Sequence, residues 1–496
     1  MLEYQNRPDR ASNPDCSISR MPTLRQHLAL LRTVARTVPF DTSTSEGRSL
    51  ERYRLIVLSM ATSVAGRGVS AIAALVVVPI AIRYLGAQQY GLWVAISSMT
   101  AWITLCDLGL TAGLLNPIAE AHGRDDRESA RGYFSTAFYS LAAIALGMAI
   151  LIAAVLPAVP WGRLLSVPPG VAGSAVTAAV AIALLLTVVH LPAGTVAQVY
   201  AGYQKAYVGT AFATAGAVLS LAAVVLAVQL KASLPWVVAA ASCTAAVAGV
   251  SSLGYLVTCE MPWLRPSRRF VSRRALRRLR ATSVPLYLFQ IGGLLVNQSQ
   301  QIVLARRVGL DVVAQYDLLW RIYVLASGLI LVSTQSFFPS FRESYERGEG
   351  AWMRSSFWHM VRLRMALAAA AAIACVGAGN FAFRLWLHDP QFQFPLPTWC
   401  LLAAFILVVV WQSSFLELLM VLDHIYPLIS VVLVQGTITV ALTWVLSRQH
   451  GVAGALLAIM VPCALLSGCL FPWFARAYLR NRLIQPARPT AAGVRN

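Results

Sequence analysis

The stretch AAIALGMAILIAAVLPAV occupies residues 142–159 and contains no charged side chain. Similar apolar runs recur along the chain, for example at 171–190 and 365–376. A hydrocarbon core ~30 Å thick needs about 20 apolar residues per helix. The runs are continuous, whereas strands that cross a membrane alternate between apolar and polar residues. They therefore predict a bundle of transmembrane helices.

The composition of the whole chain agrees with this interpretation. Of the 496 residues, 58% are hydrophobic and only 12% are charged, which excludes an ordinary soluble protein. A net charge of +20 would suggest nucleic acid as the partner of a soluble protein. Here Lys and Arg lie between the apolar runs, so we expect no nucleic-acid partner.

The sequence contains none of the common catalytic motifs. It has no phosphate-binding Gly-x-x-x-x-Gly-Lys-[Ser/Thr] loop, no His-Glu-x-x-His and no Gly-x-Ser-x-Gly. The eight cysteines form no Cys-x-x-Cys and no cluster with histidine. We therefore expect no enzyme, no catalytic residue, no metal site and no cofactor.

Apolar runs and polar breaks predict about twelve helices and an all-α polytopic membrane protein. The predicted spans are 55–82, 90–116, 133–158, 172–196, 208–230, 236–257, 283–305, 316–338, 358–382, 396–420, 429–446 and 452–475.

The distribution of Lys and Arg predicts the orientation of these helices. With the N-terminus in the cytosol, the cytosolic segments contain 29 Lys and Arg residues and the external loops contain seven. Cytosolic loops carry such an excess in membrane proteins, so both termini are predicted to be cytosolic. Eight of the arginines lie in the loop 258–282, between the sixth and seventh helices.

This loop divides the chain into two predicted lobes of six helices. The predicted organisation is a cytosolic, mostly disordered tail (1–54), an N-lobe (55–257), a basic cytosolic linker (258–282), a C-lobe (283–476) and a cytosolic C-terminal tail (477–496).

A short motif occurs in both lobes. Arg83-Tyr84-Leu85-Gly86 leads to Tyr90 in the first lobe, and Arg307-Val308-Gly309 leads to Tyr316 in the second. Trp93 and Trp320 follow, and we interpret both as aromatic anchors at the outer surface. Six helices separate the copies, which indicates a parallel repeat with a substrate path between the lobes.

Three segments resemble the polysaccharide transporters of the multidrug/oligosaccharidyl-lipid/polysaccharide (MOP) exporter superfamily, which include O-antigen flippases. They are the first copy of the repeat motif (79–86, with 90–93), Asp107-Leu108-Gly109-Leu110, and the loop 116–123. The resemblance covers roughly residues 55–476 and is strongest in the first four helices. It implies a MATE-like fold, with two lobes around a central cavity.

The resemblance also implies a function. It implies a flippase of the cell inner membrane that moves an isoprenoid-pyrophosphate-linked oligosaccharide to the outer leaflet by alternating access. The implied partners are the lipid-linked oligosaccharide, membrane lipids and other polysaccharide-assembly proteins. Members often carry an acidic residue in the seventh helix, where this chain has Gln300; this position therefore lacks a titratable carboxylate for proton coupling.

Two charged residues fall near mid-bilayer on neighbouring helices. Arg67 lies ~18 Å from the cytosolic end of the first helix, and Asp107 ~14 Å from that of the second, at 1.5 Å per residue. Intramembrane charges are costly and are often functional. Arg67 either binds pyrophosphate or pairs with Asp107. For Asp107 itself, a structural role is the better explanation.

Further candidates lie on later helices. Gln290, Asn297 and Gln300 share one side of the seventh helix and could bind sugar hydroxyls or neighbouring helices. Arg321 is predicted to pair with Asp317, four residues earlier, and is a further cavity candidate. Glu417 and His190, near the cytosolic ends of their helices, either titrate during transport or only fix packing.

Three rival functions remain open at this point. A drug or organic-cation exporter of the same superfamily would favour carboxylates in its cavity. A flippase for a peptidoglycan lipid precursor would move a similar diphosphate. A polytopic polymerase or glycosyltransferase would need large outer loops, and the longest predicted outer loop, near residues 158–172, is short.

Overall fold

A computed structural model describes residues 45–167, 172–332, 341, 344, 350–389, 392–422 and 425–483. Most of the predicted N-terminal tail and the end of the C-terminal tail lie outside these residues. The first helix begins at Ser45, so it reaches into the predicted tail 1–54. The chain divides after Ala61 into two units. The second unit contains the first helix from Thr62 onward and all the later helices.

The described residues are almost entirely helical and contain no strand, which confirms the predicted all-α class. The helices are α2 (Ser45–Thr104), α3 (Leu110–Gly113), α4 (Leu115–Gly123), α5 (Arg127–Val155), α6 (Trp161–Leu164), α7 (Gly173–His190), α8 (Thr195–Gly202), α9 (Ala206–Gln229), α10 (Leu234–Tyr255), α11 (Arg273–Asn297), α12 (Ser299–Arg307), α13 (Leu310–Val332), α15 (Gly350–Leu387), α16 (Leu396–Val421), α17 (Ile425–Pro462) and α18 (Gly468–Leu483).

Eight helical segments of the described chain are long and apolar enough to span a membrane, or nine with the bent segment Arg273–Arg307. Two of these segments each contain two of the predicted helices, which are joined at a glycine with non-helical backbone angles. Gly86 (φ 74°) interrupts α2, and Gly451 (φ 52°) interrupts α17. Positive φ is unfavourable for other residues, so glycine permits these abrupt turns between consecutive spans.

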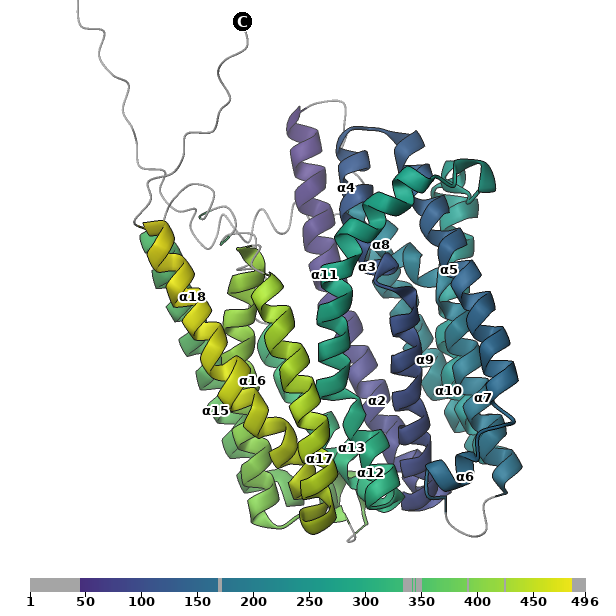
Figure 1. The fold of residues 1–496 in the computed structure, drawn as a ribbon, viewed down its shortest axis with the longest axis vertical. Coiled ribbons are helices and arrows are strands. Elements are labelled where there is room, and N and C mark those ends of the chain that lie inside the picture. The colour runs from purple at the N-terminus through teal and green to yellow at the C-terminus, as the bar shows by residue number, and fades with distance from the viewer. Residues whose placement is uncertain are drawn as a thin grey trace, which may run out of the picture. The chain divides into compact units, whose positions relative to one another are not determined.

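The helices of the second unit pack in two groups (Figure 1). Helix α10 packs against α7 and α9, whereas α16 packs against α15, α17 and α18. Helix α11 contacts both groups: it packs on α3 and α5 of the first and on α17 of the second. It is bent by 47° between Arg273–Ala281 and Ser283–Arg307. Pro285 follows the bend and cannot donate a backbone hydrogen bond to the preceding turn.

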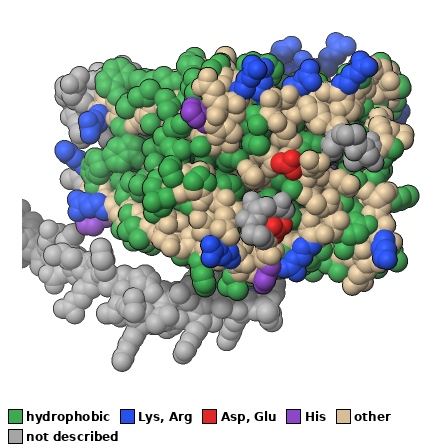
Figure 2. Space-filling view, turned by 90° about the horizontal axis from the view of Figure 1, so that it is seen from below, with side chains coloured by type: hydrophobic (Ala, Val, Ile, Leu, Met, Phe, Trp, Pro, Cys, Tyr) green, Lys and Arg blue, Asp and Glu red, His purple; other side chains and the backbone are tan. Residues whose placement is uncertain are grey.

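Much of the apolar surface faces outward. In the most apolar window of α5 only 17% of the residues are buried, and Leu146 and Ile150 are each 64% exposed. A lipid environment accommodates such side chains, while each helix satisfies its own backbone hydrogen bonds. Figure 2 shows the end of the bundle that bears α6 and α12, where Lys and Arg lie mainly around the edge. These features support a multi-pass membrane protein.

Candidate functional site

A cavity with a volume of about 870 Å³ lies between α2, α9 and α13. Its walls come from residues 64–75 of α2, residues 210–214 of α9 and residues 317–329 of α13. On α13 the lining residues recur every three or four positions, which places them on one helix face. Most of the lining side chains are apolar.

Three charged residues line this cavity: Arg67, Asp317 and Arg321. Arg67 is exposed, and within the described part of the chain its guanidinium makes no ion pair or hydrogen bond. Arg321 donates from Nε to Asp317 Oδ2 at 2.7 Å, which confirms the predicted i, i+4 pair. Two arginines and one carboxylate give the cavity a net positive charge, and the exposed guanidinium of Arg67 is available to an anion.

Asp317 also connects α13 to α2. Tyr90, which is 1% exposed on α2, donates its hydroxyl hydrogen to Asp317 Oδ2 at 2.6 Å. Next to it, Gly91 lies so close to Leu310 of α13 that a Cβ atom would overlap the Leu310 carbonyl oxygen. We call Tyr90, Gly91, Leu310 and Asp317 the α2–α13 contact. Asp317 belongs both to this contact and to the cavity lining.

Further polar contacts surround the α2–α13 contact. Gln88 donates to Asp311 at 3.1 Å, and the indole of Trp386 donates to the Leu75 carbonyl oxygen at 2.9 Å. Arg83 and His388 form a hydrogen bond of 3.0 Å. All these contacts join α2 to later helices near the predicted outer end. They hold α2 against the later helices at that end.

Asp107 occupies a break between helices and does not line the cavity. It is buried, and its Oδ1 accepts a hydrogen bond of 2.7 Å from the Gly109 backbone amide. Leu108 and Gly109 both have positive φ, at 52° and 72°. Among the described residues no ion pair joins Asp107 to Arg67. The Asp107 carboxylate thus stabilises a sharp turn.

The three amides that were candidates for binding either sugar or neighbouring helices are absent from the cavity lining. Asn297 donates to the Gly293 carbonyl oxygen at 2.7 Å, within its own helix. Gln300 is completely buried and donates to the Val296 carbonyl oxygen at 2.6 Å. Gln290 is half-buried on α11, which contributes no residue to the cavity lining.

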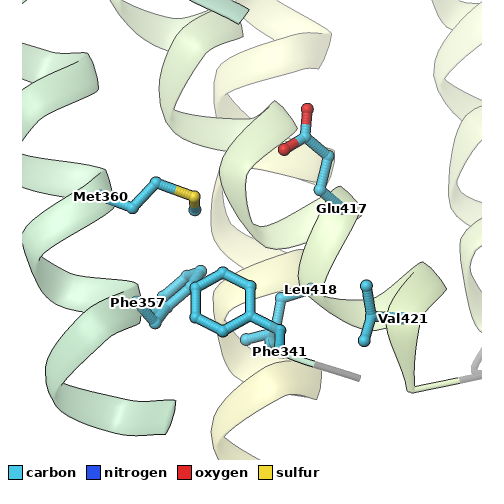
Figure 3. A pocket seen from close by; sticks show the side chains of 6 residues that line it. All are labelled: Phe341, Phe357, Met360, Glu417, Leu418 and Val421. Carbon is cyan, nitrogen blue, oxygen red and sulfur yellow. The ribbon is translucent and has the colours of Figure 1, made fainter. Parts of the chain in front are cut away.

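Glu417 and His190 also lie elsewhere. Glu417 pairs with the fully buried Arg364 at 2.5 Å, inside the second group of helices. Figure 3 shows its carboxylate directed away from Phe341 and Phe357, in a pocket of about 10 Å³. This space holds about one water molecule, too little for a transported molecule. His190 packs against Gly249, where a Cβ atom would overlap its ring.

Some relevant residues were not among the predicted candidates. Trp320 was interpreted as an outer-surface anchor, but it lines the cavity. Tyr90 was noted only as part of the repeat motif. Arg364 was missed, although a charged residue inside the predicted span 358–382 was a signal that could have found it.

Comparisons with known proteins place the chain in a family. Residues 57–344, more than half of the chain, match the model of a family described as polysaccharide biosynthesis protein. No match was found among curated proteins.

Solved structures share the fold at low sequence identity. One is an inward-facing multidrug resistance MATE family transporter of the MOP superfamily, with a TM-score of 0.70 and 14% identity over 84% of this chain and 96% of that chain. Its outward-facing counterpart has a TM-score of 0.64 and 14% identity, over 88% and 97%. A MOP superfamily transporter from Pyrococcus furiosus, described as having a binding pocket of reverse polarity, has a TM-score of 0.64 and 13% identity over the same shares. The MATE-like fold is thus confirmed.

Proposed function

Since this chain belongs to the polysaccharide biosynthesis protein family, we propose that it moves an isoprenoid-diphosphate-linked oligosaccharide across the cytoplasmic membrane. The fold is that of MOP-superfamily transporters, and alternating access between two groups of helices is the mechanism we propose. In this mechanism the protein binds and carries its substrate and catalyses no covalent step.

The observation that carries the proposal is the exposed Arg67, which has no partner among the described residues and lies in a largely apolar cavity. A charged side chain at the bilayer centre costs ~2.5–3.5 kcal/mol on insertion scales. A diphosphate offers oxygen acceptors that suit the planar donors of a guanidinium. The apolar walls, which include the 63% exposed Ile72, suit an isoprenoid chain.

Deletion of the gene tests the substrate class. We expect loss of a surface glycan, with lipid-linked oligosaccharide accumulating on the cytosolic leaflet. If only resistance to cationic drugs fell, the protein would be a drug exporter instead. If cell-wall synthesis stopped while other surface glycans persisted, a peptidoglycan lipid precursor would be the substrate.

Two substitutions test the role of Arg67. Arg67→Ala should abolish transport at normal protein levels, and Arg67→Lys should restore only part of it, because an ammonium retains the charge but loses the bidentate geometry. The neutral pair Arg67→Gln with Asp107→Asn should not restore transport, since Asp107 bonds to the Gly109 amide rather than to Arg67. Full rescue by that pair would reject Arg67 as a ligand.

The proposed orientation places both termini and the arginine-rich loop 258–282 in the cytosol. Reporter fusions after Arg163 should therefore behave as external, and fusions after Arg269 as cytosolic. An external signal at Arg269 would reverse the orientation and would place the α2–α13 contact at the cytosolic end.

A further inference from the structure

The cavity needs a surface for sugar that the amides of α11 and α12 do not provide. Asn297 and Gln300 donate within their own helices, and neither lines the cavity. The cavity lining does include one large aromatic side chain, Trp320, which directly precedes Arg321 on α13. A group held by Arg321 would have Trp320 as its neighbour.

Trp320 is held in place by other aromatic rings. The ring of Tyr316 stacks on it at a centroid distance of 6.0 Å and an interplanar angle of 19°. Tyr323 lies 4.7 Å away and Phe405, from α16, lies 6.3 Å away. Tyr316 and Phe405 are almost fully buried, whereas Trp320 is half-buried and borders the cavity. The indole is therefore fixed from behind, with part of its surface accessible.

We propose that Trp320 is the platform on which the first sugar next to the diphosphate stacks. The inference rests on the proposed function and assigns a sugar-binding role within the same cavity. The face of an indole carries negative quadrupole charge, which attracts the weakly positive C–H groups on the face of a sugar ring. Because the ring is already fixed, binding loses little side-chain entropy.

The charged neighbours of Trp320 complete the site. Asp317 lies three positions before Trp320, and Arg321 lies one position after it. All three side chains line the cavity. Sugar hydroxyls can accept hydrogen bonds from Arg321 and donate to the second oxygen of the Asp317 carboxylate. The diphosphate, placed between Arg67 and Arg321, would hold the attached sugar against the indole.

Binding of two matched probes to the purified protein in lipid nanodiscs tests this role. One probe is a short-chain isoprenyl diphosphate, and the other is the same diphosphate carrying one hexose. The unaltered protein should bind the hexose-bearing probe roughly two- to tenfold more tightly, the usual range for aromatic stacking. Trp320→Leu should remove this preference and leave affinity for the bare diphosphate unchanged.

Two variants serve as controls. Trp320→Phe keeps a smaller aromatic face and should retain a reduced preference for the hexose-bearing probe. This variant also tests the proposal if Trp320→Leu fails to fold. Phe381→Leu is a matched loss of an aromatic ring on α15 that is exposed, does not line the cavity and does not contact Trp320. It should keep the preference of the unaltered protein for the hexose.

The outcomes separate this inference from the proposed function. Equal affinities for the two probes, or an equal loss of both affinities in Trp320→Leu, would overturn the sugar platform and leave the flippase standing. If the unaltered protein bound neither probe, the flippase itself would be rejected, and the platform with it. Loss of binding of an aromatic organic cation in Trp320→Leu, with no effect of the hexose, would also overturn the platform and would favour the drug exporter.

Discussion

Replacing Tyr90 with Phe should open the α2–α13 contact with little other effect. The substitution removes one hydroxyl, which donates to Asp317 at 2.6 Å in a buried environment. Hydrogen bonds to charged groups are worth roughly 1.5–3 kcal/mol. Since 1.4 kcal/mol is about a factor of ten, the equilibrium should shift roughly 10- to 150-fold toward the state with the contact separated.

Cross-linking across the contact measures this shift. Gln88 and Asp311 lie on either side, with Nε2 and Oδ2 3.1 Å apart. Cysteines at these two positions, in a background without the native cysteines, should react with a short bifunctional reagent. The yield of cross-linked protein should fall when Tyr90→Phe is added.

Tyr316→Phe is a matched control on the facing helix. The Tyr316 hydroxyl is buried and has no hydrogen-bond partner in the described structure. Removing it deletes the same atom without removing a hydrogen bond, so the cross-linking yield should not change. Equal yields in Tyr90→Phe and the parent, or an equal decrease in Tyr316→Phe, would refute the role assigned to Tyr90.

Two further predictions concern packing. Gly91→Ala should destabilise the closed contact by about 1–3 kcal/mol, because the new methyl group would overlap the Leu310 carbonyl oxygen; Gly147→Ala, with open space around it, should have no such effect on cross-linking. Glu417→Gln should lower the free energy of unfolding by roughly 1–3 kcal/mol, because it removes a charge-assisted hydrogen bond to the fully buried Arg364. The double change to Arg364→Met and Glu417→Leu should recover much of that loss, and no recovery would mean that the pair has another role.

The sequence by itself determined the membrane class and the approximate positions of most helices, although the structure breaks the predicted span 90–116 at residues 105–109. Long apolar runs can only be accommodated as membrane-spanning helices, since backbone groups in lipid must be satisfied within the segment. The repeated motif also indicated two turn positions. Its glycines, Gly86 and Gly309, both have positive φ in the structure. The pair Arg321–Asp317 was predictable because it is local, four residues apart on one helix.

Only the tertiary structure decided which of the candidate residues share a cavity. Depth along a helix, which the sequence provides, placed Arg67 and Asp107 at similar levels but did not give the direction of their side chains. Where a helix is largely apolar on all sides, its sequence pattern does not show which face meets lipid and which lines the cavity. The spacing of residues therefore did not predict that Asn297 is absent from the cavity lining or that Trp320 belongs to it. Tyr90 and Asp317 are 227 residues apart, and such a contact is fixed by how the two groups of helices pack.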